Sequence, residues 1–254
     1  MNQQFVQSAV MKRAQENLLA LKANPYPGRG IVFGLDESGL NFVQIYWIMG
    51  RSESSRNRIF VEEAGGLLRT DASDPKKFEG KDTSLIIYPA MIEKGSIYAV
   101  SNGHQTAAVA ELKTLDHLED ALYNWSYESD APNNTPRITA VLTLDANIRY
   151  SHAEMAILKK VKENDDCERI YFNQPLHEKG IGYCLTTYSG DGDPLPSFVG
   201  APYPLPLTGN IEDVLQIFWD HLDPDNRVSL AVKFINKLTG ISTIRKMNKY
   251  LRVG

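Results

Sequence analysis

Apolar residues recur at helical spacing in three separate stretches of the chain. Between residues 3 and 22 they lie three or four positions apart, which predicts an amphipathic helix that ends before two closely following prolines. The same spacing predicts a long helix over residues 106–126, with one buried face. A third helix is expected over residues 210–222, and Asn210 is suited to cap its N-terminus.

Elsewhere the apolar residues alternate with polar ones or form short runs rich in β-branched and aromatic side chains. Both patterns are typical of strands. The tripeptide Glu93-Lys94-Gly95 predicts a hairpin turn between two of them. Strands are expected at residues 31–35, 42–50, 58–63, 84–92, 96–102, 138–144, 169–174 and 181–190.

Four segments are harder to assign from their pattern. Residues 148–158 begin as an extended segment, but 153–162 has helical character. The proline-rich stretch 191–207 predicts a loop. Residues 227–236 are compatible with a strand or a helix, and a helix is expected in the basic tail, 244–254.

The order of these elements predicts the fold class. Strands joined by hairpins alternate with helices, which favours an α+β fold over a doubly wound parallel sheet. The sequence shows no internal repeat, low-complexity tract or linker, so a single domain over residues 1–254 is expected.

Composition narrows the possible functions. The chain is 43% hydrophobic and 23% charged, as in ordinary globular proteins. Its net charge of −4 argues against broad nucleic-acid binding, and no apolar run has the length of a membrane span. The N-terminus lacks the apolar core of a secretory signal, and two cysteines, Cys167 and Cys184, cannot form a disulfide framework. A cytoplasmic protein without nucleic-acid or membrane partners is therefore expected.

An arginine-rich turn, GRSESSRNRIF (50–60), is the strongest candidate for chemistry. Arg51, Arg56 and Arg58 lie there among serines and Asn57, although the whole chain is acidic. Guanidinium groups match phosphate oxygens two at a time, so the turn is suited to binding an anion. The alternative from this segment alone is a solvated turn between strands.

Four further features add polar groups near the ends of predicted strands. VSNGH (100–104), YESD (127–130), NTPR (134–137) and Tyr88 each carry side chains that could line a pocket. Read singly, they are equally explained as turns, a solvated helix end, a surface charge and a core tyrosine.

Known catalytic and metal-binding motifs are absent from the sequence. It contains no P-loop, dinucleotide-binding or nucleophile-elbow pattern. Its five histidines form no HxH, HxxxH or HExxH pair, so no protein-bound metal is expected.

Taken together, the motifs resemble one family, the archaeal-type IMP cyclohydrolases. Residues 186–202 resemble a longer bacterial branch of this family, whereas residues 1–23 form a helical extension beyond the shorter pattern. The resemblance rests on GRG (28–30), GRS…NR (50–58), Tyr88, VSNG (100–103), YE (127–128) and NTPRITA (134–140), in that order.

This resemblance implies a four-layer αββα sandwich similar to the N-terminal-nucleophile hydrolases. It implies dehydrative closure of 5-formamidoimidazole-4-carboxamide ribonucleotide to IMP, with no metal, organic cofactor or N-terminal nucleophile. The implied catalytic residues are Arg58, Tyr88, Asn102 and Glu128. The implied substrate-binding residues are Arg29, Arg51, Ser52, Arg56, Asn57, Ser101, His104 and Arg137.

Within this reading, Arg29, Arg51 and Arg56 would anchor the phosphate or ribose. Arg58 and Asn102 would polarise the formyl oxygen or stabilise the developing oxyanion. Glu128 would take the carboxamide proton, and Tyr88 would donate to the departing oxygen. Two other functions remain open: a diverged hydrolase of a purine nucleotide or related amide, and a non-catalytic purine-nucleotide sensor. The oligomeric state is also open, with a homo-oligomer as one option.

Overall fold

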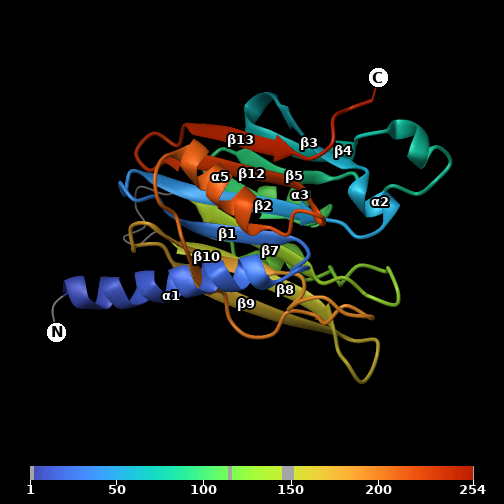
Figure 1. Cartoon of the computed structure of the whole chain (residues 1–254), viewed down its shortest axis with the longest axis horizontal. Coiled ribbons are helices and arrows are strands. Elements are labelled where there is room, and N and C mark those ends of the chain that lie inside the picture. Colours follow the sequence, from blue (N-terminus) through green and yellow to red (C-terminus); the bar gives the residue numbers. More distant parts are fainter. Residues whose placement is uncertain (1–2, 114–115, 145–151, 254) are drawn as a thin grey trace.

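The computed structural model describes residues 3–113, 116–144 and 152–253, with side chains from residue 9 and, after the second gap, from residue 153. Two antiparallel sheets dominate this part of the chain (Figure 1). The first has the order β11-β10-β1-β2-β12-β13. Its strands are β1 (Gly30–Leu35), β2 (Asn41–Met49), β10 (Ile181–Thr186), β11 (Tyr203–Pro206), β12 (Arg227–Asn236) and β13 (Ser242–Asn248).

The second sheet follows the chain order from β3 to β9. It is a meander, in which each strand pairs with its neighbour in sequence. Its strands are β3 (Arg58–Glu63), β4 (Leu67–Ala72), β5 (Pro89–Lys94), β6 (Ile97–Ser101), β7 (Arg137–Thr143), β8 (His152–Lys160) and β9 (Cys167–Pro175).

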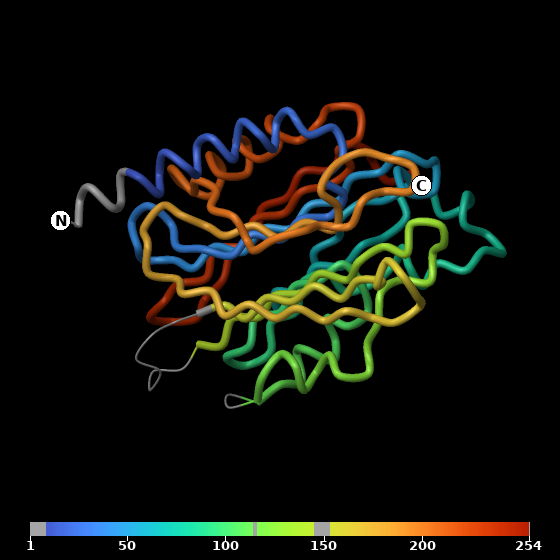
Figure 2. Tube along the Cα trace, turned by 90° about the horizontal axis from the view of Figure 1, so that it is seen from below, coloured from blue at the N-terminus to red at the C-terminus, as the bar shows by residue number. Residues whose placement is uncertain are grey.

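Helices cover the outer face of each sheet, giving the layer order helix, sheet, sheet, helix (Figure 2). The first sheet is covered by α1 (Gln3–Ala23) and α5 (Ile211–His221), and the second by α3 (Gln105–Ala110) and α4 (Leu118–Leu122). The largest apolar cluster lies between the sheets. Short helices also occur in the loops: α2 (Glu53–Arg56), η1 (Ala64–Gly66) and η2 (Pro75–Phe78).

Several predictions from the sequence are confirmed. The antiparallel sheets and mixed helix and strand content make this an α+β fold. The N-terminal helix forms, and Asn210 caps α5 by accepting hydrogen bonds from Glu212 N and Asp213 N. Residues 227–236, which were open between strand and helix, are the strand β12.

The predicted helix over residues 153–162 is wrong, because this segment is mostly the strand β8. Along β8, Ala153, Met155 and Ile157 face the core between the sheets, whereas Ala156 and Leu158 pack under the helices. Both faces of the strand are therefore apolar, which hides the alternation that identifies a half-buried strand. Within the segment 148–158, residues 148–151 lie outside the described residues.

The continuous helix predicted over 106–126 is also wrong. Its described parts form the two short helices α3 and α4. His117 has an extended backbone (φ −102°, ψ 154°) and forms a capping box with Asp120, which starts a new helix in place of extending the first. Sequence periodicity alone did not reveal this local stop.

Three predicted boundaries change as well. The tail does not form a helix from residue 244: β13 occupies Ser242–Asn248 at the edge of the first sheet. The strand expected from residue 84 begins only at Pro89, after a turn. The proline-rich loop contains the short edge strand β11. This strand tolerates Pro204 and Pro206 because an edge strand leaves some N–H positions unpaired.

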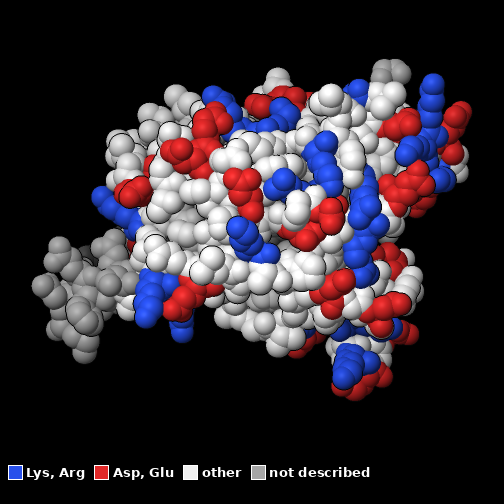
Figure 3. Space-filling model, in the orientation of Figure 1, with Lys and Arg blue, Asp and Glu red and all other residues white. Residues whose placement is uncertain are grey.

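No helix within the described residues combines the length and apolar character needed to cross a membrane. Acidic and basic side chains are interspersed over the face shown in Figure 3.

Candidate active-site cavity

A cavity of about 300 Å³ lies where loops from both sheets meet at one end of the sandwich. Its walls come from the segments before β1, after β2, before β5, before β7 and after β10, so residues distant in sequence share it. The lining residues are Tyr26, Arg29, Arg51, Ser52, Ser54, Ser55, Arg58, Leu85, Ile86, Glu128, Asp130, Asn133, Thr135, Tyr188 and Leu195.

The arginine-rich turn folds into the short helix α2, which fixes where its side chains lie. Ser52 caps this helix by accepting a hydrogen bond from Ser55 N at 3.1 Å. Gly50 is required beside it, because a Cβ there would lie 2.7 Å from the carbonyl group of Ser55. The turn is therefore an ordered wall of the cavity.

Arg56 and Asn57 do not line the cavity; they brace the turn from outside. The Arg56 guanidinium donates to Gly50 O at 3.0 Å and to Asn226 Oδ1 at 3.3 Å. Asn57 Nδ2 donates to Asp74 O, and its Oδ1 accepts from Ser73 Oγ. The predicted contact of these two residues with substrate gains no support from their positions.

Arg58 is a buried cation with unused donors. Its side chain is 1% exposed, and Nε donates to Ser55 O at 2.9 Å. Neither terminal guanidinium nitrogen has a hydrogen-bond partner among the described residues. Burial and the neighbouring Arg29 charge lower the Arg58 pKa. Two free donors on a buried charge are unfavourable unless a ligand completes them.

Arg29 is the second buried arginine of the cavity. Its Nε also lacks a partner within the described chain. Burial alone would lower its pKa, but attraction to Glu128 and to nearby tyrosines outweighs burial and raises the pKa well above its usual value. Arg29 therefore remains fully charged beside Arg58, and this part of the cavity concentrates positive charge.

Arg51 lies at the exposed mouth of the cavity and is paired. It forms an ion pair with Asp191 and donates to Gly192 O at 3.0 Å. Its guanidinium lies 4.9 Å from the centroid of the Tyr26 ring. Unlike Arg29 and Arg58 in the described structure, Arg51 makes a direct ion pair with a carboxylate.

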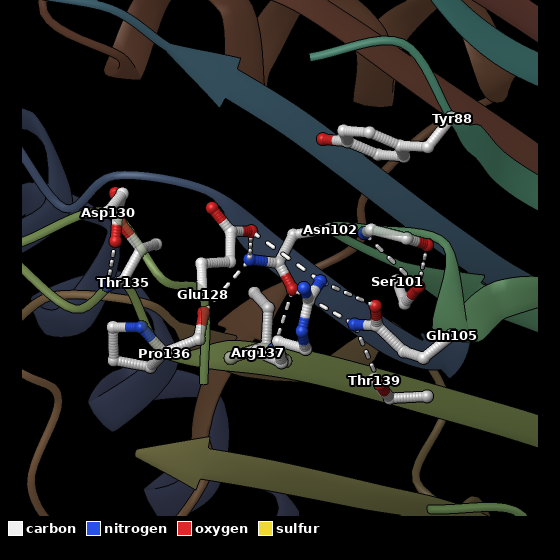
Figure 4. A network of polar contacts seen from close by, with 12 residues as sticks. Tyr88, Ser101, Asn102, Gln105, Glu128, Asp130, Thr135, Pro136, Arg137 and Thr139 are labelled. Atoms are coloured by element: carbon white, nitrogen blue, oxygen red, sulfur yellow. Dashed lines mark hydrogen bonds and ion pairs between the residues drawn. The ribbon is translucent and has the colours of Figure 1, made fainter. Parts of the chain in front are cut away.

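Glu128 is the buried carboxylate of the cavity, at 1% exposure. Its Oε1 accepts a hydrogen bond from Asn102 Nδ2 at 3.2 Å and lies 3.9 Å from the Arg137 guanidinium (Figure 4). The other carboxylate oxygen makes no such contact in Figure 4. Burial raises the Glu128 pKa to about 7, although the surrounding arginines oppose the shift. A carboxylate with this pKa can accept or donate a proton near neutral pH.

Asn102 has no hydrogen-bonding capacity left for a ligand. Its amide nitrogen donates to Glu128 Oε1 and Pro136 O, and its Oδ1 accepts from Ile138 N and Gln105 Nε2. All four positions of the amide are therefore filled. The structure places Asn102 as a support for Glu128.

Arg137 and Ser101 belong to the polar network around Asn102 and Glu128, and neither they nor His104 line the cavity. Arg137 donates to Gln105 Oε1 at 3.0 Å, and Gly103 makes this possible, because a Cβ there would lie 2.2 Å from Arg137. Ser101 Oγ donates to Gly103 O, whereas His104 is exposed.

Tyr88 is also buried next to the cavity. Its hydroxyl lies 2.7 Å from the Tyr46 hydroxyl, and its ring meets His104 edge-on at 6.3 Å. Burial raises the Tyr46 pKa well above its usual value. The two phenols therefore form a buried pair near the arginines.

Comparison with known families settles the relationship of the chain. A family model described as IMP cyclohydrolase-like protein matches residues 26–239. The chain belongs to the IMP cyclohydrolase-like family. This confirms the family suspected from the sequence motifs. No curated protein matches the chain.

Every residue that lines the cavity lies within the part matched by the IMP cyclohydrolase-like family. The helix α1, which ends at Ala23, and the strand β13 lie outside it. The cavity is therefore a property of the family region and not of the two terminal additions.

The sequence motifs missed two aromatic residues of the cavity, Tyr26 and Tyr188. Their rings stack with centroids 6.1 Å apart, and the Tyr188 hydroxyl lies 2.6 Å from Thr135 Oγ1. Gly28 permits this approach, because a Cβ there would lie 2.5 Å from the Tyr188 ring. Tyr188 follows a buried strand and precedes a Gly-Asp-Gly segment. The same kind of signal, a strand end followed by polar residues and glycine, singled out residues 100–104 in the sequence.

Asp130 and Thr135 complete this wall. Thr135 donates from its backbone N, at 2.6 Å, and from its hydroxyl to Asp130 (Figure 4). Since its proton goes to Asp130, Thr135 Oγ1 accepts from the Tyr188 hydroxyl. No group of His, Cys, Asp and Glu side chains arranged to hold a metal ion occurs among the described residues.

Proposed function

We propose that the protein is an IMP cyclohydrolase, which closes the second ring of 5-formamidoimidazole-4-carboxamide ribonucleotide with loss of water. One observation carries the proposal. Two buried arginines with unused donors share a cavity with a buried carboxylate whose pKa is about 7. Membership of the IMP cyclohydrolase-like family supports the same reaction.

The arginines define the kind of ligand. Arg29 and Arg58 are both buried and repel one another, so an anion there would relieve both the repulsion and the unfilled donors. A phosphate or a developing oxyanion satisfies guanidinium groups at two positions each. The cavity volume of about 300 Å³ is at the lower end of the range for small-molecule sites.

The chemistry requires positioning and proton transfer. The carboxamide nitrogen attacks the formyl carbon, a C–N bond forms, and the formyl oxygen becomes a hydroxyl. Loss of that hydroxyl as water then gives the ring. Because both groups belong to one molecule, holding them together removes much of the barrier.

Glu128 is the group best suited to move the protons. As a carboxylate it takes the proton from the attacking nitrogen, and as a carboxylic acid it returns a proton to the departing oxygen. Arg58 would stabilise negative charge on that oxygen. Asn102 would orient Glu128, in place of the direct contact with the formyl oxygen expected from the motifs. Tyr88 would assist by donating a hydrogen bond from its hydroxyl, which lies next to the Tyr46 hydroxyl, to the departing oxygen.

Glu128→Gln tests this assignment. The change keeps the shape of the side chain but removes its proton-accepting capacity, so turnover should fall about 10²- to 10⁴-fold. Ring closure is followed by the ultraviolet absorbance change, and IMP affinity by titration calorimetry. Glu163→Gln, an exposed position, is the matched control and should retain full turnover. Unchanged turnover in Glu128→Gln would remove this residue from the mechanism.

The same assay separates the alternative functions. Tight IMP binding without ring closure by the unmodified protein would favour a sensor. Release of formate or ammonia from a purine-related substrate would favour a diverged hydrolase.

The remaining expectations belong to the same proposal. The helix–sheet–sheet–helix order supports the relationship to the N-terminal-nucleophile hydrolase fold that was inferred from the family resemblance. A purine ribonucleotide as ligand, a cytoplasmic location and possible self-association complete the picture.

A further inference from the structure

The mouth of the cavity contains a cation that is already neutralised. Arg51 forms its ion pair with Asp191, and both side chains are partly exposed, at 37% and 48%. Asp191 belongs to the loop after β10, whereas Arg51 follows β2. The pair therefore closes a contact between two loops at the entrance.

The loop that carries Asp191 is anchored at its base by hydrogen bonds that do not involve Asp191. Ser189 N donates to Pro196 O at 3.0 Å, and Phe198 N donates to Thr187 O at 3.0 Å. Leu195 N donates to Asn133 Oδ1, which ties the loop to the opposite wall. Asp191 lies between these anchors, so its side chain can leave Arg51 without disturbing them.

Arg51 would keep its place if Asp191 left. Its guanidinium remains held by Gly192 O and by the Tyr26 ring. Tyr26 is itself buried and stacked on Tyr188. A guanidinium held in this way is prepared to accept a second anion in place of the carboxylate.

We propose that the Asp191 carboxylate competes with the phosphate of the ligand for Arg51 and thereby sets the affinity of the site for anions. This inference rests on the proposed function, in which the ligand carries a 5′-phosphate. An exposed ion pair is weak, so a phosphate dianion displaces the Asp191 carboxylate at small cost, whereas a ligand without a phosphate does not. The exchange limits how tightly a nucleotide, including the product, is held, and leaves the affinity for a ligand without a phosphate unchanged.

Asp191→Asn tests the competition, and the same loop offers a matched control. Asp193 lies two positions away, is exposed, and makes no hydrogen bond or ion pair with any described residue. Asp193→Asn therefore removes the same charge from the same loop without freeing Arg51. Titration calorimetry with IMP and with inosine, at one fixed ionic strength, compares both variants with the unmodified protein.

Asp191→Asn should bind IMP about two- to five-fold more tightly than Asp193→Asn, as expected for the loss of an exposed ion pair. The affinity for inosine should be equal in the two variants. In an Arg51→Met background the difference should vanish, because no guanidinium remains to be released.

Two results would overturn the inference. Equal IMP affinity in Asp191→Asn and Asp193→Asn would show that the effect is only one of net charge. Weaker binding in Asp191→Asn would show that Asp191 positions Arg51 for the ligand. Either result leaves the proposed function intact, whereas failure of the unmodified protein to bind IMP or close the ring would refute that function itself.

Discussion

Two buried cations of this protein have opposite surroundings. Lys233 on β12 is 0% exposed, and its ammonium donates to Gly66 O at 2.8 Å and to Glu93 Oε2 at 3.3 Å. Arg58 is 1% exposed, but within the described part of the chain it has one hydrogen bond and two unused nitrogens. Both lie between the sheets or at their end, yet only the lysine is satisfied by the protein.

This contrast distinguishes a structural charge from one reserved for a ligand. Lys233 links the two sheets through Glu93, which Ser242 also supports with a hydrogen bond at 2.6 Å. Burial lowers the Lys233 pKa, and the Glu93 charge opposes that shift. Arg58 instead has another arginine as its charged neighbour. Unsatisfied burial is unfavourable for folding, so its presence in a cavity is evidence for function.

Among the changes that test this contrast between the two buried cations, the largest effect is expected from removing the unsatisfied one. Arg58→Met should lower kcat/KM for ring closure about 10²- to 10³-fold, because the developing oxyanion loses its donors. The free energy of unfolding should fall by no more than about 1 kcal/mol, since only the hydrogen bond to Ser55 is lost. Kinetics and urea unfolding measure the two quantities.

Arg245→Met is the control for this change, because Arg245 is half-exposed and pairs with Glu212 on the outer surface. It should alter neither quantity appreciably. A large loss of stability in Arg58→Met, with normal activity per folded molecule, would make Arg58 a structural cation like Lys233.

The next effect is a dependence on pH that arises from Glu128. Its pKa in the folded protein is about 7, above the ordinary value of 4.5, so the folded state binds the proton more tightly. Its stabilising contribution is therefore complete below pH 4.5 and is lost as the pH rises through 7. Relative to Glu128→Gln, the unmodified protein should lose about 3 kcal/mol of unfolding free energy over that range.

Urea unfolding of both proteins at several pH values measures this difference, with Glu163→Gln as the exposed control. A constant difference across the range would contradict the raised pKa. In the same window, kcat/KM of the unmodified protein should rise with pH, because the carboxylate form of Glu128 takes the carboxamide proton.

The smallest effect is expected from the satisfied cation. Lys233→Met should lower the free energy of unfolding by about 2 kcal/mol, because Gly66 O and Glu93 lose a buried donor. Turnover per folded molecule should stay normal. Lys237→Met, at an exposed position of the following turn, controls for the loss of charge. An increase in stability would mean that burial of the ammonium outweighs its two contacts.

Local sequence predicted the elements whose residue types favour one kind of structure. The helix α5 has a clear N-cap and an apolar face, and the strands at residues 31–35 and 42–50 form as expected. The strand β8 was missed because it is apolar on both faces and its Ala, Met, Leu and Lys residues favour a helix, so only its pairing with β7 and β9 identifies it as a strand. The break between α3 and α4 depends on one residue, His117, and its cap.

The candidate site shows the same division. The order of the motifs was sufficient to indicate the IMP cyclohydrolase-like family and to single out Arg29, Arg58 and Glu128, which line one cavity. It could not distinguish Arg58 from Arg56, two positions away, because their side chains leave the turn on different sides. Nor could it show that Asn102 is fully occupied or that Tyr188 belongs to the wall.

The sequence by itself thus determined the α+β class, the family and the residue types needed to bind an anion and move a proton. These depend on local patterns and on the order of motifs along the chain. Only the tertiary structure decided which charges are paired, because pairing depends on loops that meet from both sheets. Asp191 neutralises Arg51 across 140 residues of sequence, whereas two Arg58 nitrogens find no partner among the residues that the structure describes.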